Sequence, residues 1–137
     1  MFPSASRTTF SRTAAAASRG AVAMQLRAAL LAGCAAALGL AAWAGNPADY
    51  LQADPALARL LRGMALLKGL IAIAAVGAVF WRFGWRVSKP AAASYLVASW
   101  VLAAATMMIW QLSCILPAAL LFHAAAISLL WVGWRER

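Results

Sequence analysis

The chain has 137 residues, of which 66% are hydrophobic and only 11% are charged. This number of charged side chains is too small to cover the surface of a soluble globule of this size. The composition therefore excludes a water-soluble domain and predicts an integral membrane protein. Twelve Lys and Arg stand against three Asp and Glu, but the basic residues lie in short segments between apolar runs, which indicates orientation signals and lipid headgroup contacts rather than nucleic-acid binding.

Residues 1–25 form a basic arm rich in Ser and Ala. The arm carries Arg7, Arg12 and Arg19 and no acidic residue. This composition is typical of a mitochondrial transit peptide, and it also suits an arm that stays on the protein. We expect an uncleaved cytoplasmic arm on a multi-pass protein of the bacterial inner membrane, with the mitochondrial inner membrane as the alternative.

Four apolar runs follow the arm, and each is long enough to cross a hydrocarbon core about 30 Å thick, which takes roughly 20 helical residues. The prolines lie outside these runs or in a first turn, where proline is tolerated. Asn46 before Pro47 and Asp54 before Pro55 each predict an N-cap followed by proline. Pro55 therefore begins either a short interfacial helix or a helix that continues into the second run. The runs cover approximately residues 26–44, 63–81, 91–110 and 115–134.

The charges between the runs orient the predicted bundle. Arg82, Arg86 and Lys89 follow the second run, on the same side as the basic arm and the C-terminal "WRER", whereas Asp49 and Asp54 lie on the opposite side. Positive residues favour the cytoplasmic side of a membrane. The sequence thus predicts an all-α fold in which residues 26–137 form a four-helix transmembrane bundle, N-in/C-in. We expect Arg82, Arg86 and Lys89 to contact lipid headgroups or other anions.

Small residues are expected to hold the bundle together, because helices in lipid gain packing energy mainly where their backbones approach closely. The first run offers two such faces, one with Ala32, Ala36 and Gly39 and one with Gly33 and Ala37. Such faces pack helices within one chain as readily as between chains, so they leave the oligomeric state open.

Lys68 is an ionisable residue inside the second run, and such residues are functional candidates by default. It follows Arg62 by six residues, which places it roughly 9 Å deeper. A lysine stem nearly covers that distance, so we expect its ammonium to reach the interface. The alternatives are a site for an anionic group or lipid phosphate and a proton carrier. No run contains Asp or Glu, which excludes a carboxylate relay and the mechanism of small multidrug resistance exporters, the nearest proteins in size.

His123 is the only histidine, and it lies within the fourth run in "LLFHAAAISLL". If the third and fourth runs form a hairpin that turns near Leu112, its imidazole is expected to hydrogen-bond Thr106, Ser99 or a backbone carbonyl across the hairpin, contributing on the order of 1 kcal/mol. The alternative is an axial ligand to haem or a chlorophyll-type pigment, with Met107 or Met108, or a histidine from a partner, as a second haem ligand. The expected neighbours of His123 on the third run are Trp100, Ala103, Thr106 and Met107.

The surroundings of His123 also carry one resemblance. Ala119 lies four residues before His123, and Trp131 and Trp134 follow near the predicted membrane edge. This pattern resembles part of the single helix of bacterial light-harvesting polypeptides. The resemblance covers only part of one helix, and it implies a pigment ligand at His123.

No part of the sequence resembles a nucleophile with its base, a phosphate-binding loop or a zinc motif. We therefore expect a non-catalytic accessory or scaffold subunit of a larger inner-membrane complex, respiratory or photosynthetic. Its partners would be membrane lipids and other integral membrane subunits, or further copies of itself, and not nucleic acid. Two alternatives remain: a haem- or pigment-binding subunit that uses His123, and a small carrier for an anionic or lipid substrate that uses Lys68.

Overall fold

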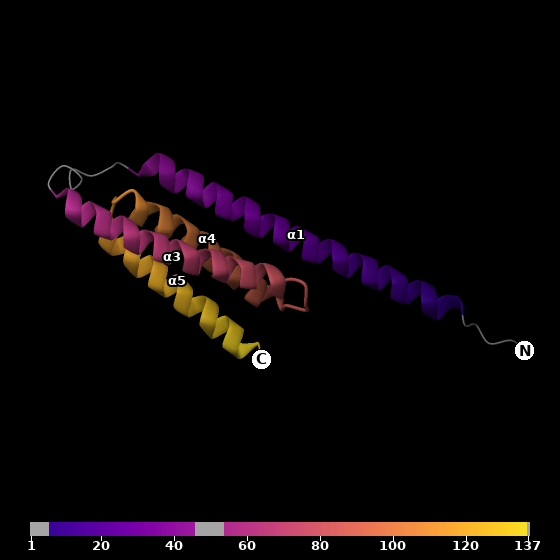
Figure 1. The fold of residues 1–137 in the computed structure, drawn as a ribbon. Coiled ribbons are helices and arrows are strands. Elements are labelled where there is room, and N and C mark those ends of the chain that lie inside the picture. The colour runs from indigo at the N-terminus through magenta and orange to yellow at the C-terminus, as the bar shows by residue number, and fades with distance from the viewer. Residues whose placement is uncertain (1–5, 46–53, 137) are drawn as a thin grey trace, which may run out of the picture.

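The computed structural model describes residues 6–45 and 54–136. Within these residues the chain forms four helices and no strand, which confirms the expected all-α class. Each helix contains a stretch long and apolar enough to cross a membrane. The helices are α1 (Ser6–Ala44), α3 (Pro55–Arg82), α4 (Lys89–Trp110) and α5 (Ile115–Arg135), shown in Figure 1.

Helix α1 begins inside the basic arm. It has 39 residues, or about 58 Å at a rise of 1.5 Å per residue, and its apolar stretch is Gly20–Ala44. In Figure 1 the indigo, N-terminal part of α1 runs past the ends of the other three helices. Residues 6–25 of the arm and the first span are therefore one continuous helix, with no break at the boundary that the sequence suggested near residue 26.

Helix α3 begins at Pro55 and continues without interruption to Arg82. The Asp54 carboxylate accepts hydrogen bonds from the backbone N–H groups of Ala56 and Leu57 at 2.9 and 3.2 Å, as expected of an N-cap. The prediction that Asp54 and Pro55 start a helix is confirmed, and the alternative of a separate short helix is wrong. The similar prediction for Asn46 and Pro47 lies outside the described residues.

Helix α4 is the centre of the bundle. In its apolar stretch 44% of the residues are buried, against 11% in α1 and 17% in each of α3 and α5. The other three helices all pack against α4, whereas α1 and α3 meet at only a few positions.

We call the end of the bundle with Arg82, Ser88 and Glu136 the Arg82 end. The opposite end, with the turn between α4 and α5, is the Gln111 end.

Helix α3 contacts α4 through one line of small residues. The buried residues of α3 are Ala58, Ala65, Ala72 and Val79, each seven residues after the last. A spacing of seven returns to the same side of a helix, so these residues face one neighbour along the whole length of α3. Their short side chains let the backbones of α3 and α4 approach closely.

Helix α1 packs against α4 at Gly33. A Cβ atom on Gly33 would overlap the indole ring of Trp100, so only glycine fits there. The face of α1 with Gly33 is thus the one turned to α4. The other face that the sequence suggested, with Ala32, Ala36 and Gly39, is exposed.

Side-chain hydrogen bonds to other elements hold α1 near both ends of the bundle. At the Arg82 end, Arg27 Nε donates to the carbonyl of Phe80 at 3.2 Å. At the Gln111 end, Gln111 Nε2 donates to the carbonyl of Ala42 at 3.0 Å. Both carbonyls lie in the last turn of a helix, where backbone acceptors lack partners of their own. These two hydrogen bonds therefore fix the position of α1 along the bundle axis.

A four-residue turn, Gln111–Cys114, joins α4 to α5 near Leu112, where the sequence suggested it. Leu112 and Cys114 both have positive φ, 60° and 47°. This conformation favours glycine and costs other residues roughly 1–2 kcal/mol. Leu112 is fully buried, so packing offsets its cost, whereas Cys114 is exposed.

Candidate functional site

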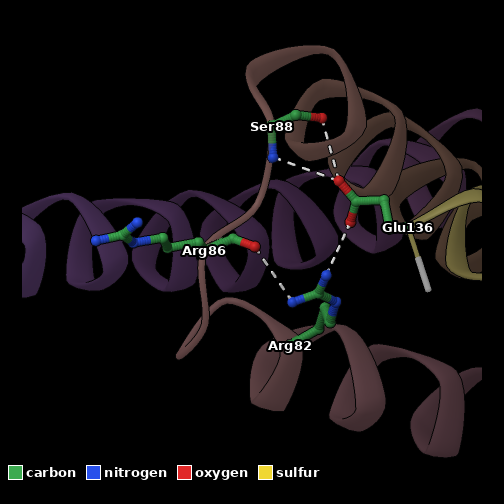
Figure 2. Close-up of polar contacts among 4 residues, drawn as sticks. All are labelled: Arg82, Arg86, Ser88 and Glu136. Carbon is green, nitrogen blue, oxygen red and sulfur yellow. Dashed lines mark hydrogen bonds and ion pairs between the residues drawn. The ribbon is translucent and has the colours of Figure 1, made fainter.

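The Arg82 end holds a compact polar cluster around Glu136, shown in Figure 2. Arg82 Nη2 lies 3.2 Å from Glu136 Oε2. The backbone N–H and the hydroxyl of Ser88 both donate to Glu136 Oε1, at 3.3 and 3.1 Å. Glu136 therefore ties the end of α5 to the end of α3 and to the start of α4. Both carboxylate oxygens of Glu136 thus have donors, and the donor on Oε2 is charged.

The other two basic residues predicted to bind anions do not join this cluster through their side chains. Only the carbonyl of Arg86 takes part, accepting from Arg82 Nη1 at 3.4 Å. The Arg86 guanidinium points away from Glu136 (Figure 2), and Lys89 is exposed at the start of α4. Arg82, Arg86 and Lys89 thus lie at one end of the bundle, as the sequence placed them. Their binding to lipid headgroups stays a prediction.

Lys68 extends across the bundle to α5. Its Nζ lies 4.5 Å from the centre of the Phe122 ring, a cation–π contact. Phe122 packs in the middle of the bundle with Ala72 and Leu102. The ammonium is therefore at the depth of the middle layer, and not at the level of Arg62 to which we expected it to reach.

His123 lies on the outer surface of α5. Its ring is exposed and meets Phe122 edge to face, with 5.7 Å between ring centres. His123 Nδ1 lies 2.6 Å from the carbonyl of Ala119, one turn earlier on the same helix. Since a carbonyl only accepts, Nδ1 carries the proton in this contact, which leaves Nε2 of the neutral ring as an outward-facing acceptor or ligand.

The expected neighbours of His123 across the hairpin are wrong. Trp100 packs against α1 instead, and the Thr106 hydroxyl donates to the carbonyl of Leu102 within α4 at 2.8 Å. The residue that α5 turns inward is Phe122, which is buried. Successive residues on a helix are about 100° apart, so a buried Phe122 places His123 outside. Met107 is half-buried on α4, and the hydrogen bond and the ring contact of His123 are both made within α5.

Lys68, Phe122 and His123 thus form one group, which we call the Lys68 face. Sequence reasoning named Lys68 and His123 separately and did not bring them together. The missing residue was Phe122, whose ring is contacted by both. Sequence reasoning also missed Glu136. The sequence does contain a signal for this residue, because Glu136 is the only acid after Asp54 and lies within the basic end "WRER".

Two grooves run along the outside of α5. The first, about 670 Å³ in volume, lies between α4 and α5 and is mostly apolar. Small residues from both helices line much of it, namely Ala93, Ser94, Ala98, Ala124, Ala125 and Ser128. The second, about 470 Å³, lies between α3 and α5 and ends at the polar cluster of the Arg82 end. Its small lining residues are Ala75, Ala78 and Gly133.

Within the described residues no three His, Cys, Asp or Glu side chains are grouped so that they could hold a metal ion. Comparison with protein-family models, curated proteins and solved structures finds no match to this chain.

Proposed function

We propose that this chain is a small accessory or scaffold subunit of a larger inner-membrane complex, with both termini in the cytoplasm. It would act without catalysis, by packing its outer faces against helices of partner subunits. The basic residues at the Arg82 end, Arg82, Arg86, Lys89 and Arg135, support this orientation, because cytoplasmic loops carry an excess of Lys and Arg.

The observation that carries this proposal is the groove between α4 and α5. Its small residues would let the backbone of a partner helix approach closely, which is the main source of helix packing energy in lipid. Two hydroxyls line it as well. Ser94 donates to the carbonyl of Pro90 at 3.0 Å and Ser128 to that of Ala124 at 2.8 Å. Each is bonded within its own helix, and each hydroxyl can rotate to bond a partner helix instead.

The test is extraction of the native membrane with a mild detergent, followed by a native gel and identification of the co-migrating chains by mass spectrometry. We expect the chain to migrate with larger partners, and Ala124→Leu, which fills the groove, to reduce their amount. Ala74→Leu is the matched control, since Ala74 is exposed on α3 away from this groove. A chain that migrates alone, near the size of a monomer or dimer, would contradict the proposal.

A second candidate function is favoured by the geometry of His123. A hydrogen bond from Nδ1 to a carbonyl fixes the ring and leaves Nε2 to ligate a metal, which is how ligating histidines are commonly held. The exposed ring and the neighbouring alanines leave room for a macrocycle such as haem or a chlorophyll-type pigment. The purified complex would then show a visible absorption band that disappears in His123→Ala. A colourless preparation that retains all its subunits would contradict this candidate.

A further inference from the structure

We propose that Lys68 is the docking point for a carboxylate carried on a membrane helix of a different protein. This inference rests on the proposed function, and it names the chemistry by which the partner subunit is recognised.

Lys68 has one partner in the described residues, and that partner is not an anion. The face of the Phe122 ring takes one side of the ammonium, whereas an ammonium has three N–H donors. The only ion pair among the described residues is Arg82–Glu136, at the Arg82 end. The positive charge of Lys68 therefore lies in apolar surroundings with its other donors unused.

An unpaired charge in this position lowers the equilibrium constant for membrane insertion on the order of a hundredfold. Charges at such depths usually pair with one another. A carboxylate from outside the chain would remove this penalty and would use the free donors. Before a partner binds, the Phe122 ring would hold the ammonium in place, because the cation–π contact keeps the Lys68 side chain directed toward α5.

A second copy of this chain cannot supply the carboxylate. The acidic residues of the sequence are Asp49, Asp54 and Glu136. None of them lies within an apolar run, and Glu136 already has donors on both oxygens. The carboxylate must therefore come from another protein. This favours a mixed assembly over a homo-oligomer, a choice that the small-residue faces left open.

The surface beside Lys68 suits a helix. Lys68, Ala75 and Arg82 are seven residues apart and so share one side of α3. Ala75 and Arg82 line the groove between α3 and α5, and Gly133 opens its opposite wall. A partner helix that lies in this groove and continues two turns past Ala75 would place a side chain beside the ammonium of Lys68.

The test compares three variants of the complex extracted from the native membrane. We expect Lys68→Met to weaken partner association on the order of a hundredfold, because removal of one member of a buried ion pair leaves the other charge uncompensated. Lys68→Arg, which keeps the charge, should retain most of the partner. Arg59→Met, which removes an exposed charge near the start of α3, is the control and should retain all of it.

A second measurement does not depend on how the variants fold. An apolar carbodiimide added to the unaltered complex should join the Lys68 amine to an adjacent carboxylate, and mass spectrometry should find Lys68 linked to Asp or Glu within a membrane helix of the co-migrating protein.

Full retention of the partner by Lys68→Met would overturn the docking site while leaving the accessory function standing. Loss of a bound phospholipid from that variant, with the partner retained, would assign Lys68 to lipid phosphate and would also overturn it. A chain that extracts alone would overturn both proposals.

Discussion

At the scale of single residues, two glycines of α1 differ in what lies beside them. A side chain at Gly33 would run into the Trp100 ring, whereas nothing lies within 4 Å of a Cβ on Gly39. Glycine normally weakens a helix by roughly 1 kcal/mol relative to alanine. At Gly33 this cost is offset by the contact between α1 and α4, and at Gly39 the structure gives no such contact.

We therefore predict opposite effects of the same substitution at the two positions. Gly33→Ala should destabilise the bundle by about 1–3 kcal/mol, because Trp100 must move. Gly39→Ala should leave stability unchanged or raise it slightly, through helix propensity alone. Thermal unfolding of both variants in the same detergent measures the difference. Equal stability of the two variants would contradict the close packing of α1 on α4.

The turn between α4 and α5 offers a second matched pair. Leu112 and Cys114 share the left-handed conformation but differ in burial. Cys114→Gly should stabilise the protein by roughly 1 kcal/mol, because glycine adopts positive φ without strain. Leu112→Gly should destabilise it by about 2–4 kcal/mol, because the loss of a buried leucine outweighs the same backbone gain. The unfolding temperatures of the two variants should therefore move in opposite directions from that of the unaltered chain.

At the scale of the helices, Glu136 joins three elements that are distant in the sequence. Its carboxylate holds α5 to α3 through Arg82 and to α4 through Ser88. Both members of the ion pair are mostly sheltered, with side-chain exposures of 15% for Glu136 and 32% for Arg82. Such a pair is screened by salt less than a fully exposed one.

Glu136→Gln should loosen the Arg82 end without unfolding the bundle. It removes the charge that strengthens three hydrogen bonds, and we expect a local loss of about 1 kcal/mol. Amide hydrogen exchange should become roughly fivefold faster in the last turn of α5 and at Ser88. Exchange in the middle of α4 should stay unchanged and serves as the internal control. Unaltered exchange at Ser88 would mean that the cluster does not hold the loop.

The sequence was sufficient for the four membrane-spanning stretches and insufficient for the N-terminal extension of α1 and for the rotation of the helices. Length and hydropathy located the four apolar runs, and the Asp54–Pro55 pair located one helix start. The few polar side chains of the four runs form no continuous stripe, however, so the sequence does not show which residues face α4. The inward position of Phe122 and the outward position of His123 follow from packing against Leu102 and Ala72. The central place of α4 likewise depends on contacts between helices that no single run reveals.

At the scale of the whole molecule, the polar cluster around Glu136 and the exposed cysteine Cys114 mark opposite ends. Arg82, Glu136 and the N-terminal extension of α1 lie at one end, and the exposed Cys114 lies at the other. Cys34 is half-buried between α1 and α4, where its thiol lies 3.9 Å from the carbonyl of Ser99. The two thiols therefore differ in access as well as in position.

This difference gives a test of the proposed orientation. With both termini in the cytoplasm, Cys114 lies on the far side of the membrane. A maleimide that cannot cross membranes should then label intact cells at Cys114, since an accessible thiol reacts readily. Cys114→Ser should abolish the labelling, and Cys34→Ser should leave it intact. Labelling that appears only after the cells are permeabilised would place Cys114 in the cytoplasm and reverse the orientation.

The line of Ala58, Ala65, Ala72 and Val79 restricts how the length of α3 can change. Adding one residue within α3 would turn everything beyond it by about 100°, so that Ala72 and Val79 would face outward and bulkier side chains would meet α4. Adding seven residues would restore the line and shift it by two turns. The second span is thus adjustable only in steps of about 10 Å, a third of the bilayer core. Its length is therefore fixed as strongly by its neighbour as by the membrane.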